Sequence, residues 1–316
     1  MKSISTLKLL LLLTCLLSVF ACDNRKPAAG PGKLRVVTTL FPIYDFARNV
    51  GGDLAEVSLL LPPGVEPHSF EPTPETIIAL SRADLFIYTG SGMEPWAEKL
   101  ADGVSRGGKP VRCEAGKGAH YLNSAHDHGG RRDEHAEHEH GKDPHIWLDP
   151  DNALSMVDRI AEGFAVARPA AAEKFAANAA AYKARLQELA NRFNSGLAVC
   201  ATREFVHGGH YAFAYLADRY KLQYISAYGV TAESEPSSQK LMELVRTIKN
   251  KKLHYIFFEE LLSPRAAETV AAETGAALLK LHGIHNVTRS ELDAGATYLS
   301  LMEQNLTVLR KGLECR

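Results

Sequence analysis

Residues 34–64 read LRVVTTLFPIYDFARNVGGDLAEVSLLLPPG, and this stretch decides the fold class. Leu34–Thr39 is a short apolar run typical of a buried strand, and Phe41–Gly52 has the spacing of a helix that ends at two glycines. Val57–Leu61 again reads as a strand, and two prolines and a glycine stop it. A strand, a helix and a second strand in this order predict an α/β unit with parallel strands.

The same alternation continues along the rest of the chain. In the first half, a helix is expected over 74–82 and a strand over 84–89. In the second half, strands are expected over 204–206, 222–226, 255–258 and 277–279, and helices over 211–220, 237–250, 264–274 and 291–312. A helix over 149–167 and a much longer one from Pro169, rich in Ala, Glu, Lys, Gln and Leu, lie between the halves.

We therefore expect an α/β protein of two lobes, each with a mostly parallel sheet flanked by helices, joined by one long rigid connecting helix. Ligands should bind in the cleft between the lobes. The expected division is a signal peptide over 1–21, a tether over 22–32, an N-terminal lobe over 33–168, a connecting helix over 169–199 and a C-terminal lobe over 200–316.

The N-terminus reads as an export signal. A short basic start precedes the apolar run Leu9–Phe20, which is too short to span a bilayer comfortably and leads into Ala21-Cys22. The end of this run resembles a lipobox, in which Cys22 is lipidated; ordinary cleavage with a free Cys22 and an uncleaved anchor are the alternatives. Each version exports the protein. We expect a lipid-anchored protein on the periplasmic face of the inner membrane or the outer face of the cell membrane.

Composition excludes several classes of protein. The chain has 36 Lys and Arg against 37 Asp and Glu, so no basic surface for nucleic acid is indicated. Cys113, Cys200 and Cys315 show no paired CxxC spacing, which argues against a thiolate zinc site. The sequence leaves open whether Cys200 and Cys315 form a disulfide.

Histidines are unevenly distributed. Residues 114–143 interrupt the α/β pattern and predict a long mobile loop with almost no apolar residues. Acidic residues alternate there with five histidines, and such tracts bind divalent metals weakly. We assign accessory weak metal sites to these five: His126, His128, His135, His138 and His140.

Four more histidines lie at turn points of the pattern. His68 is in PPGVEPHSFEPTP (62–74), where the prolines restrict the loop and lower the entropic cost of binding. His145 is in DPHIWLDP (143–150), His210 opens HYAFAYLADRY (210–220), and His282 is in LHGIH (281–285).

These motifs, together with IFFEELLSPRAAETVAAETGA (256–276), resemble the metal-binding lipoproteins of zinc and manganese ABC importers, the ZnuA/TroA-like (cluster A-I) proteins. The resemblance covers nearly all of the mature chain and implies that His68, His145 and His210 are metal ligands. The family often has Asp at a fourth position, where His282 falls in this chain. His285 or a water molecule remains an alternative to His282.

The donor chemistry indicates the zinc type. Neutral imidazole suits Zn²⁺, whereas Mn²⁺ favours sites richer in carboxylates, so manganese is the alternative metal. Carboxylates near the histidines could orient the rings as hydrogen-bond acceptors, or could equally be helix caps or surface groups; the candidates are Glu66, Glu71, Asp149, Glu235 and Glu259.

The resemblance implies a monomeric carrier that delivers zinc to a membrane permease and its cytoplasmic ATPase, held to the membrane by a lipid anchor. An enzyme is the main rival class, because three histidines on zinc with an open position can activate water. The chain has no HExxH, GxSxG or phosphate-loop motif, so we expect no catalysis. A surface adhesin that uses metal only to stiffen its fold is the second rival.

Overall fold

The computed structural model describes residues 32–316 except 69, 91, 106–109, 124–140 and 231–234. The expected signal peptide, Cys22, almost all of the tether and the five loop histidines lie outside the described residues.

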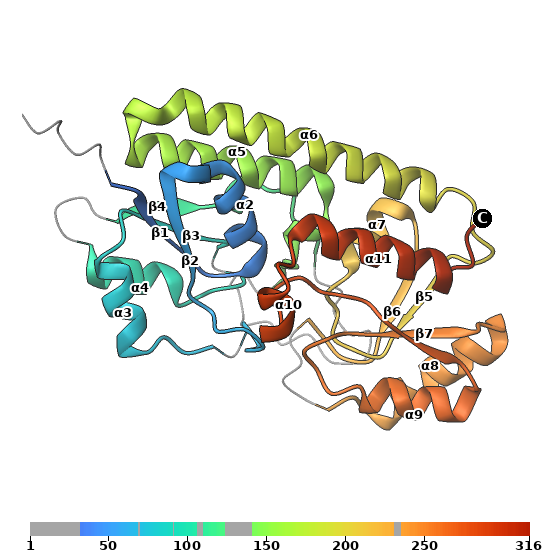
Figure 1. The fold of residues 1–316 in the computed structure, drawn as a ribbon. Coiled ribbons are helices and arrows are strands. Elements are labelled where there is room, and N and C mark those ends of the chain that lie inside the picture. Colours follow the sequence, from blue (N-terminus) through green and yellow to red (C-terminus); the bar gives the residue numbers. More distant parts are fainter. Residues whose placement is uncertain (1–31, 69, 91, 106–109, 124–140, 231–234) are drawn as a thin grey trace, which may run out of the picture. The chain divides into compact units, whose positions relative to one another are not determined.

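Two sheets with the same topology form the framework (Figure 1). The first has the order β2-β1-β3-β4, with β1 (Leu34–Thr38), β2 (Ala55–Leu59), β3 (Leu85–Tyr88) and β4 (Val111–Glu114). The second has the order β6-β5-β7-β8, with β5 (Glu204–His207), β6 (Gln223–Ser226), β7 (Tyr255–Phe258) and β8 (Ala277–Lys280). Every strand pair in both sheets is parallel, so the predicted fold class is confirmed.

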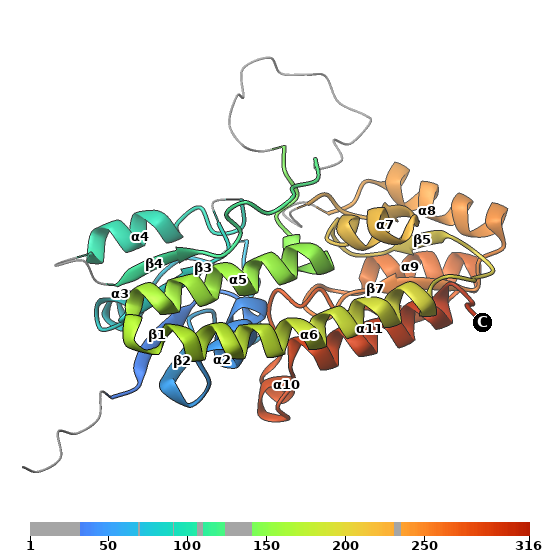
Figure 2. The ribbon, with the colours of Figure 1, turned by 90° about the horizontal axis from the view of Figure 1, so that it is seen from above.

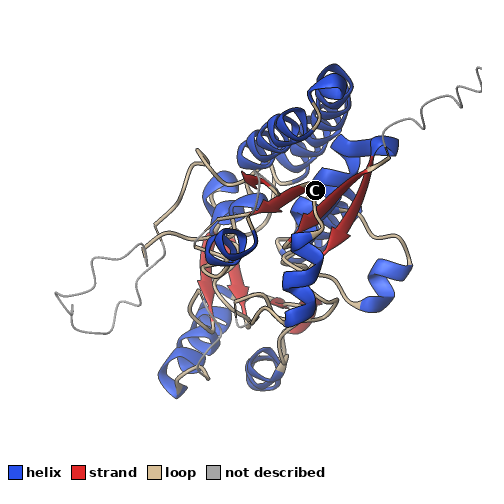
Figure 3. Ribbon diagram, turned by 90° about the vertical axis from the view of Figure 1, so that its left-hand side faces the viewer, coloured by secondary structure: helices blue, strands red, loops and turns tan. Residues whose placement is uncertain are grey.

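Helices cover both faces of each sheet, as the colouring by element type shows (Figure 3). In the N-terminal lobe, α3 (Pro74–Ser81) and α4 (Ala97–Val104) pack on one face, and α2 (Phe41–Gly51) and α5 (Pro150–Ala167) on the other. In the C-terminal lobe, α8 (Ser238–Lys251) and α9 (Arg265–Thr274) cover one face, while α7 (Ala214–Tyr220) and α11 (Tyr298–Gly312) lie on the other.

Helix α6 (Ala172–Gly196) runs beside both lobes (Figures 1 and 2). Its buried residues recur every three to four positions, from Phe175 through Tyr182 and Leu186 to Phe193, which gives one continuous apolar stripe. This stripe packs against α5 and α2 in the first lobe and α11 in the second. One hydrophobic core therefore extends through both lobes.

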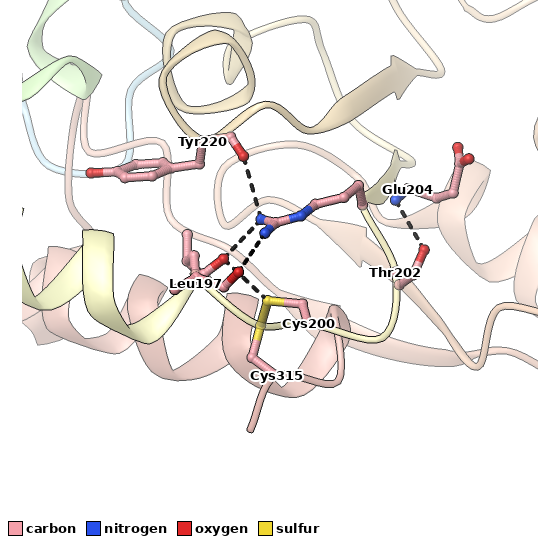
Figure 4. Close-up of a disulfide and its surroundings, with 8 residues drawn as sticks. Leu197, Cys200, Thr202, Glu204, Tyr220 and Cys315 are labelled. Carbon is pink, nitrogen blue, oxygen red and sulfur yellow. Dashed lines mark hydrogen bonds between the residues drawn. A yellow bond between two sulfur atoms is a disulfide. The ribbon is translucent and has the colours of Figure 1, made fainter.

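The end of α6 is also tied covalently to the C-terminus. Cys200 and Cys315 form a disulfide with an S–S distance of 2.02 Å (Figure 4). Beside it, the guanidinium of Arg203 donates hydrogen bonds to the carbonyl oxygens of Leu197, Ala198 and Tyr220. These contacts join the last turn of α6 to the C-terminal lobe.

The structure differs from the sequence-based expectation in three places. The helix expected over 291–312 is two helices, α10 (Arg289–Asp293) and α11, because Gly295 has a left-handed φ of 75° and Thr297 starts α11 with a capping box. Helix α4 and strand β4 have no counterpart among the expected elements. Part of the loop expected over 114–143 is ordered, since Ala115 and Gly116 continue the bonding to β3 and Asn123 pairs with Lys142.

Among the helices within the described residues, none is both long enough and apolar enough to span a bilayer.

Candidate metal centre

Three histidines from separate loops converge between the lobes. His68 lies in the loop between β2 and α3, His145 immediately precedes the 3-10 helix η2 (Ile146–Leu148), and His210 lies between β5 and α7. The Nε2 atom of His145 is 3.4 Å from that of His68 and 3.1 Å from that of His210. The ligand atoms of all three lie within 4.8 Å of one another.

This spacing matches the needs of a small cation. Two nitrogens that are each ~2.0–2.1 Å from a zinc ion in tetrahedral geometry are ~3.3–3.4 Å apart. Without a cation, three imidazole Nε2 atoms that face each other have few hydrogens to share, so their convergence is costly unless a ligand accepts their lone pairs. The geometry therefore suits a metal bound through Nε2 of all three rings.

Buried carboxylates lie behind two of the rings. Asp143 Oδ1 accepts hydrogen bonds from Nδ1–H of His145 at 2.8 Å and from the backbone N–H of His145 at 2.9 Å. Glu259 Oε2 lies 2.5 Å from Nδ1 of His210, and its Oε1 accepts from the backbone N–H of His210 at 2.7 Å. A carboxylate at Nδ1 keeps the proton there, orients the ring and leaves the Nε2 lone pair for a metal.

Of the five carboxylates named from the sequence, Glu259 occupies such a position. Asp149 caps α5 by accepting from the N–H of Asn152, and Glu235 accepts from the hydroxyl of Tyr228. Sequence analysis missed Asp143, although its position two residues before His145 was the available signal.

Burial controls the protonation of the centre. The pKa of His68 is lowered to about 3, chiefly by burial and in addition by the neighbouring His145 and His210. Burial likewise holds the pKa of His145 well below its usual range. For His210 burial acts in the same direction, but Glu259 outweighs it and raises the pKa. Burial opposes the charge of Glu259, yet His210 lowers the pKa of this carboxyl to about 2, so the two form an ion pair.

The fourth histidine near the group is His285, not His282. The His285 ring centroid lies 5.6 Å from that of His210 and 6.4 Å from that of His145. Its side chain is buried, and Nδ1 has no hydrogen-bond partner among the described residues. The ligand atoms of His285 do not join the group of three within 4.8 Å.

Among the described residues, His282, which sequence analysis assigned as the fourth ligand, does not join the group of three either. Its Nδ1 accepts from the backbone N–H of Ile284 at 2.9 Å, and its Nε2 lies 3.6 Å from Glu291 Oε2. Between His282 and His285, Ile284 has a left-handed φ of 63°. That conformation costs a non-glycine residue roughly 1–2 kcal/mol, so local sequence preferences do not predict it.

Two glycines allow the close packing. A Cβ on Gly209 would lie 2.0 Å from Glu259 Oε1 and 2.6 Å from Cε1 of His207. A Cβ on Gly283 would lie 2.8 Å from Nδ1 of His285. His207 itself is a structural neighbour, because its Nδ1 lies 3.1 Å from the carbonyl oxygen of His210 and burial lowers its pKa to about 4.

Known sequences agree with this picture. The chain is 37% identical over 318 residues to the zinc-binding lipoprotein AdcA of Streptococcus pneumoniae, a match that covers 98% of this chain and 61% of AdcA. It is 35% identical over 310 residues to the high-affinity zinc uptake system protein ZnuA of Bacillus subtilis, which covers 96% of this chain and 97% of ZnuA. The chain thus spans about three-fifths of the length of AdcA but nearly all of ZnuA.

Solved structures are similar as well. Zn(II)-bound AdcA from Streptococcus pneumoniae matches with a TM-score of 0.74 and 36% identity, over 90% of this chain and 58% of that chain. The metal-dependent lipoprotein YcdH from Bacillus subtilis matches with a TM-score of 0.75 and 33% identity, over 89% of this chain and 99% of that chain. The family model described as zinc-uptake complex component A, periplasmic (ZnuA), matches residues 36–312. The chain therefore belongs to the ZnuA family of zinc-uptake components.

Proposed function

We propose that this chain is the extracytoplasmic zinc-binding component of an ABC importer, which captures Zn²⁺ between its lobes and delivers it to a membrane permease. The observation that carries the proposal is the convergence of the Nε2 atoms of His68, His145 and His210. Zinc-binding relatives that align with nearly the whole chain support it.

The proposed ligands are His68, His145 and His210, with His285 closing the coordination shell in place of His282. His285 is buried, and its ring lies beside those of His145 and His210. A fourth imidazole gives zinc the closed tetrahedral shell typical of a carried ion and leaves no position for a reacting water. This argues for carriage over hydrolysis.

The donor set favours zinc over manganese. The buried carboxylates Asp143 and Glu259 lie at Nδ1 of their histidines, on the side away from the converging Nε2 atoms. An ion at the centre therefore meets imidazole nitrogens, which suit Zn²⁺, and not the oxygen-rich shell that Mn²⁺ favours.

Zinc release should depend on the loop that carries His68 and not on wide opening of the lobes. Trp147 Nε1–H donates to the carbonyl of Gly283 at 2.9 Å, and the Tyr298 hydroxyl donates to the carbonyl of Trp147 at 2.6 Å. The backbone N–H of Tyr298 in α11 also donates to the buried Asp45 of α2 at 3.2 Å. Opening the cleft would break these buried bonds, whereas His68 is only partly buried.

The remaining assignments concern delivery. Lipidation of Cys22 would tether the chain at the membrane beside its permease and ATPase. The histidines of the segment 124–140 would bind zinc weakly and raise its local concentration near the centre.

The proposal is tested by elemental analysis of protein purified from its host, followed by chelator-competition titration with zinc and manganese. One tightly bound zinc per chain, a much weaker manganese complex, and loss of zinc uptake on gene deletion are expected. Preferential manganese binding, or hydrolytic activity that depends on bound zinc, would refute it.

A further inference from the structure

The turn after β8 has a backbone conformation that its residues do not favour. Ile284 is β-branched and completely buried, yet its φ is 63°. A β-branched residue in the left-handed region is an outlier and persists only where surrounding contacts hold it. The next residue in the chain is His285, so the conformation of Ile284 decides where that imidazole points.

His282 provides the contact that holds the turn. Its Nδ1 accepts the N–H of Ile284, two residues further along the chain, at 2.9 Å. This is the bond pattern of an Asx turn, which Asn and Asp side chains usually make. The His282 backbone is fixed in turn by Asn305, whose Oδ1 accepts the His282 N–H and whose Nδ2 donates to the His282 carbonyl, both at 2.8 Å.

Gly283 is held equally firmly between these two residues. Its N–H donates to Glu260 Oε2 at 3.1 Å, and its carbonyl accepts from Trp147 Nε1 at 2.9 Å. Glu260 Oε1 also lies 3.1 Å from Nδ1 of His282. The turn therefore has little freedom to change its direction once His282 is in place.

The same turn is bonded to the loop that carries His68. Asn286 Nδ2 donates to the carbonyls of Pro62 and Val65, both at 2.8 Å, and the N–H of Gly64 donates to the carbonyl of Val287 at 2.8 Å. Displacement of the turn would consequently move both His285 and the loop that carries His68.

We propose that His282 is a positioning residue that acts through His285: it holds the left-handed turn that aims the His285 imidazole at the three-histidine group, and does not itself coordinate zinc. The inference rests on the proposed zinc-binding function. It predicts that an acceptor at the Nδ1 position is what matters at residue 282, and not an imidazole.

The test compares His282→Asn with His282→Ala. Asparagine places Oδ1 the same number of bonds from the backbone as Nδ1 of His282, so it can accept from Ile284 but cannot replace an imidazole ligand through Nε2. Zinc affinity, measured by chelator competition, should fall about 10-fold or more in His282→Ala, as for other residues that orient ligands, and stay within about threefold of wild type in His282→Asn. His254→Asn, an exposed histidine of the same lobe, is the matched control.

Two further readouts separate positioning from coordination. In a His285→Ala background, His282→Ala should cause no additional loss of zinc affinity, because the two residues act as one unit. The visible absorption of the cobalt-substituted protein should be unchanged in His282→Asn and altered in His285→Ala. Thermal unfolding of the zinc-free variants checks that each is folded before titration.

Equal weakening in His282→Asn and His282→Ala, with an altered cobalt spectrum in both, would show that His282 is a ligand. Wild-type affinity in a folded His282→Ala variant would overturn the positioning role. Failure of the wild-type protein to bind zinc would instead overturn the proposed function, and this inference with it.

Discussion

Two parts of the metal centre are built in different ways. The carboxylate-backed pair consists of His145 with Asp143 and His210 with Glu259, all buried. The proline loop, residues 62–74, carries His68, which is only partly buried. The pair is preorganised for a cation, whereas the loop is the part that can move without breaking a buried ion pair. Affinity should therefore come chiefly from the pair, and exchange of the ion from the loop.

The largest effect should follow removal of a ring from the pair. His145→Ala should weaken zinc binding by more than about 100-fold, since loss of a ligand exceeds the about 10–100-fold cost of losing its orienting partner. His68→Ala should weaken binding less and mainly raise the rate of zinc release. Chelator competition and stopped-flow dissociation measure the two quantities. If His68→Ala lowers the zinc affinity as much as His145→Ala or more, the loop contributes no less to affinity than the pair, and the proposed difference between them is wrong.

Removal of the carboxylates sharpens the comparison. Glu259→Gln and Asp143→Asn should each weaken zinc binding by about 10–100-fold, because the ring they orient loses its fixed proton and direction. Glu71→Gln alters an exposed carboxylate of the proline loop and should leave the affinity unchanged. The same titration measures all three. Equal behaviour of Glu259→Gln and Glu71→Gln would contradict the role of the pair.

Acid should weaken zinc binding through the pair and not through the loop. The pKa of His68 is lowered to about 3, and that of His145 lies well below its usual range. Both rings are therefore already neutral between pH 5 and 7 and release no proton when zinc binds. His210, whose pKa is raised by Glu259 against the effect of burial, is charged below that pKa, and burial raises the pKa of Asp143 to about 7. Zinc therefore displaces one to two protons, and the dissociation constant should rise roughly 10- to 100-fold for each pH unit of acidification below neutrality.

Titrations at several pH values, with calorimetry in buffers of different ionisation enthalpy, count these protons. Three or more protons released per zinc would contradict the lowered pKa values of His68 and His145.

Motion confined to the proline loop predicts a small change in the size of the molecule. The radius of gyration from small-angle scattering should differ little between zinc-free and zinc-bound protein, because the buried Trp147–Gly283 and Tyr298–Asp45 bonds hold the lobes together. A large contraction on zinc binding would show that the lobes themselves open.

The smallest effect on the tight site should come from the histidine-rich segment. Deletion of 124–141 should leave one tight zinc site intact and remove the weak additional binding, as measured by titration to saturation. Zinc uptake at limiting zinc should fall in the same variant. Loss of tight binding would show that primary ligands lie within the segment.

Much of the fold could be predicted from the sequence because its signals are local. Apolar runs bounded by Gly and Pro mark strands such as β1, and good helix formers mark α6. Helix α4 and β4 were missed because their local signals are weak: Trp96 gives α4 no side-chain cap, and β4 contains the charged residues Arg112 and Glu114. The break between α10 and α11 depends on the left-handed Gly295, which sequence pattern alone does not reveal.

The candidate site also has a part that the sequence predicts and a part that it does not. His68, His145 and His210 each lie in a recognisable loop motif, and the structure brings the three together. The proposed choice of His285 over His282 rests on the turn at the left-handed Ile284, a conformation that local propensity opposes. The pairing of Glu259 with His210 joins residues 49 positions apart, so no local pattern could rank it above the other carboxylates.

The most direct test of the central claim is X-ray absorption at the zinc K-edge on protein loaded with one equivalent of zinc and lacking 124–141. We predict three to four imidazole nitrogens at ~2.0–2.1 Å in a four-coordinate shell, with no sulfur. A shell dominated by oxygen, a sulfur ligand, or fewer than three imidazoles would contradict a zinc centre built from the carboxylate-backed pair and the proline loop.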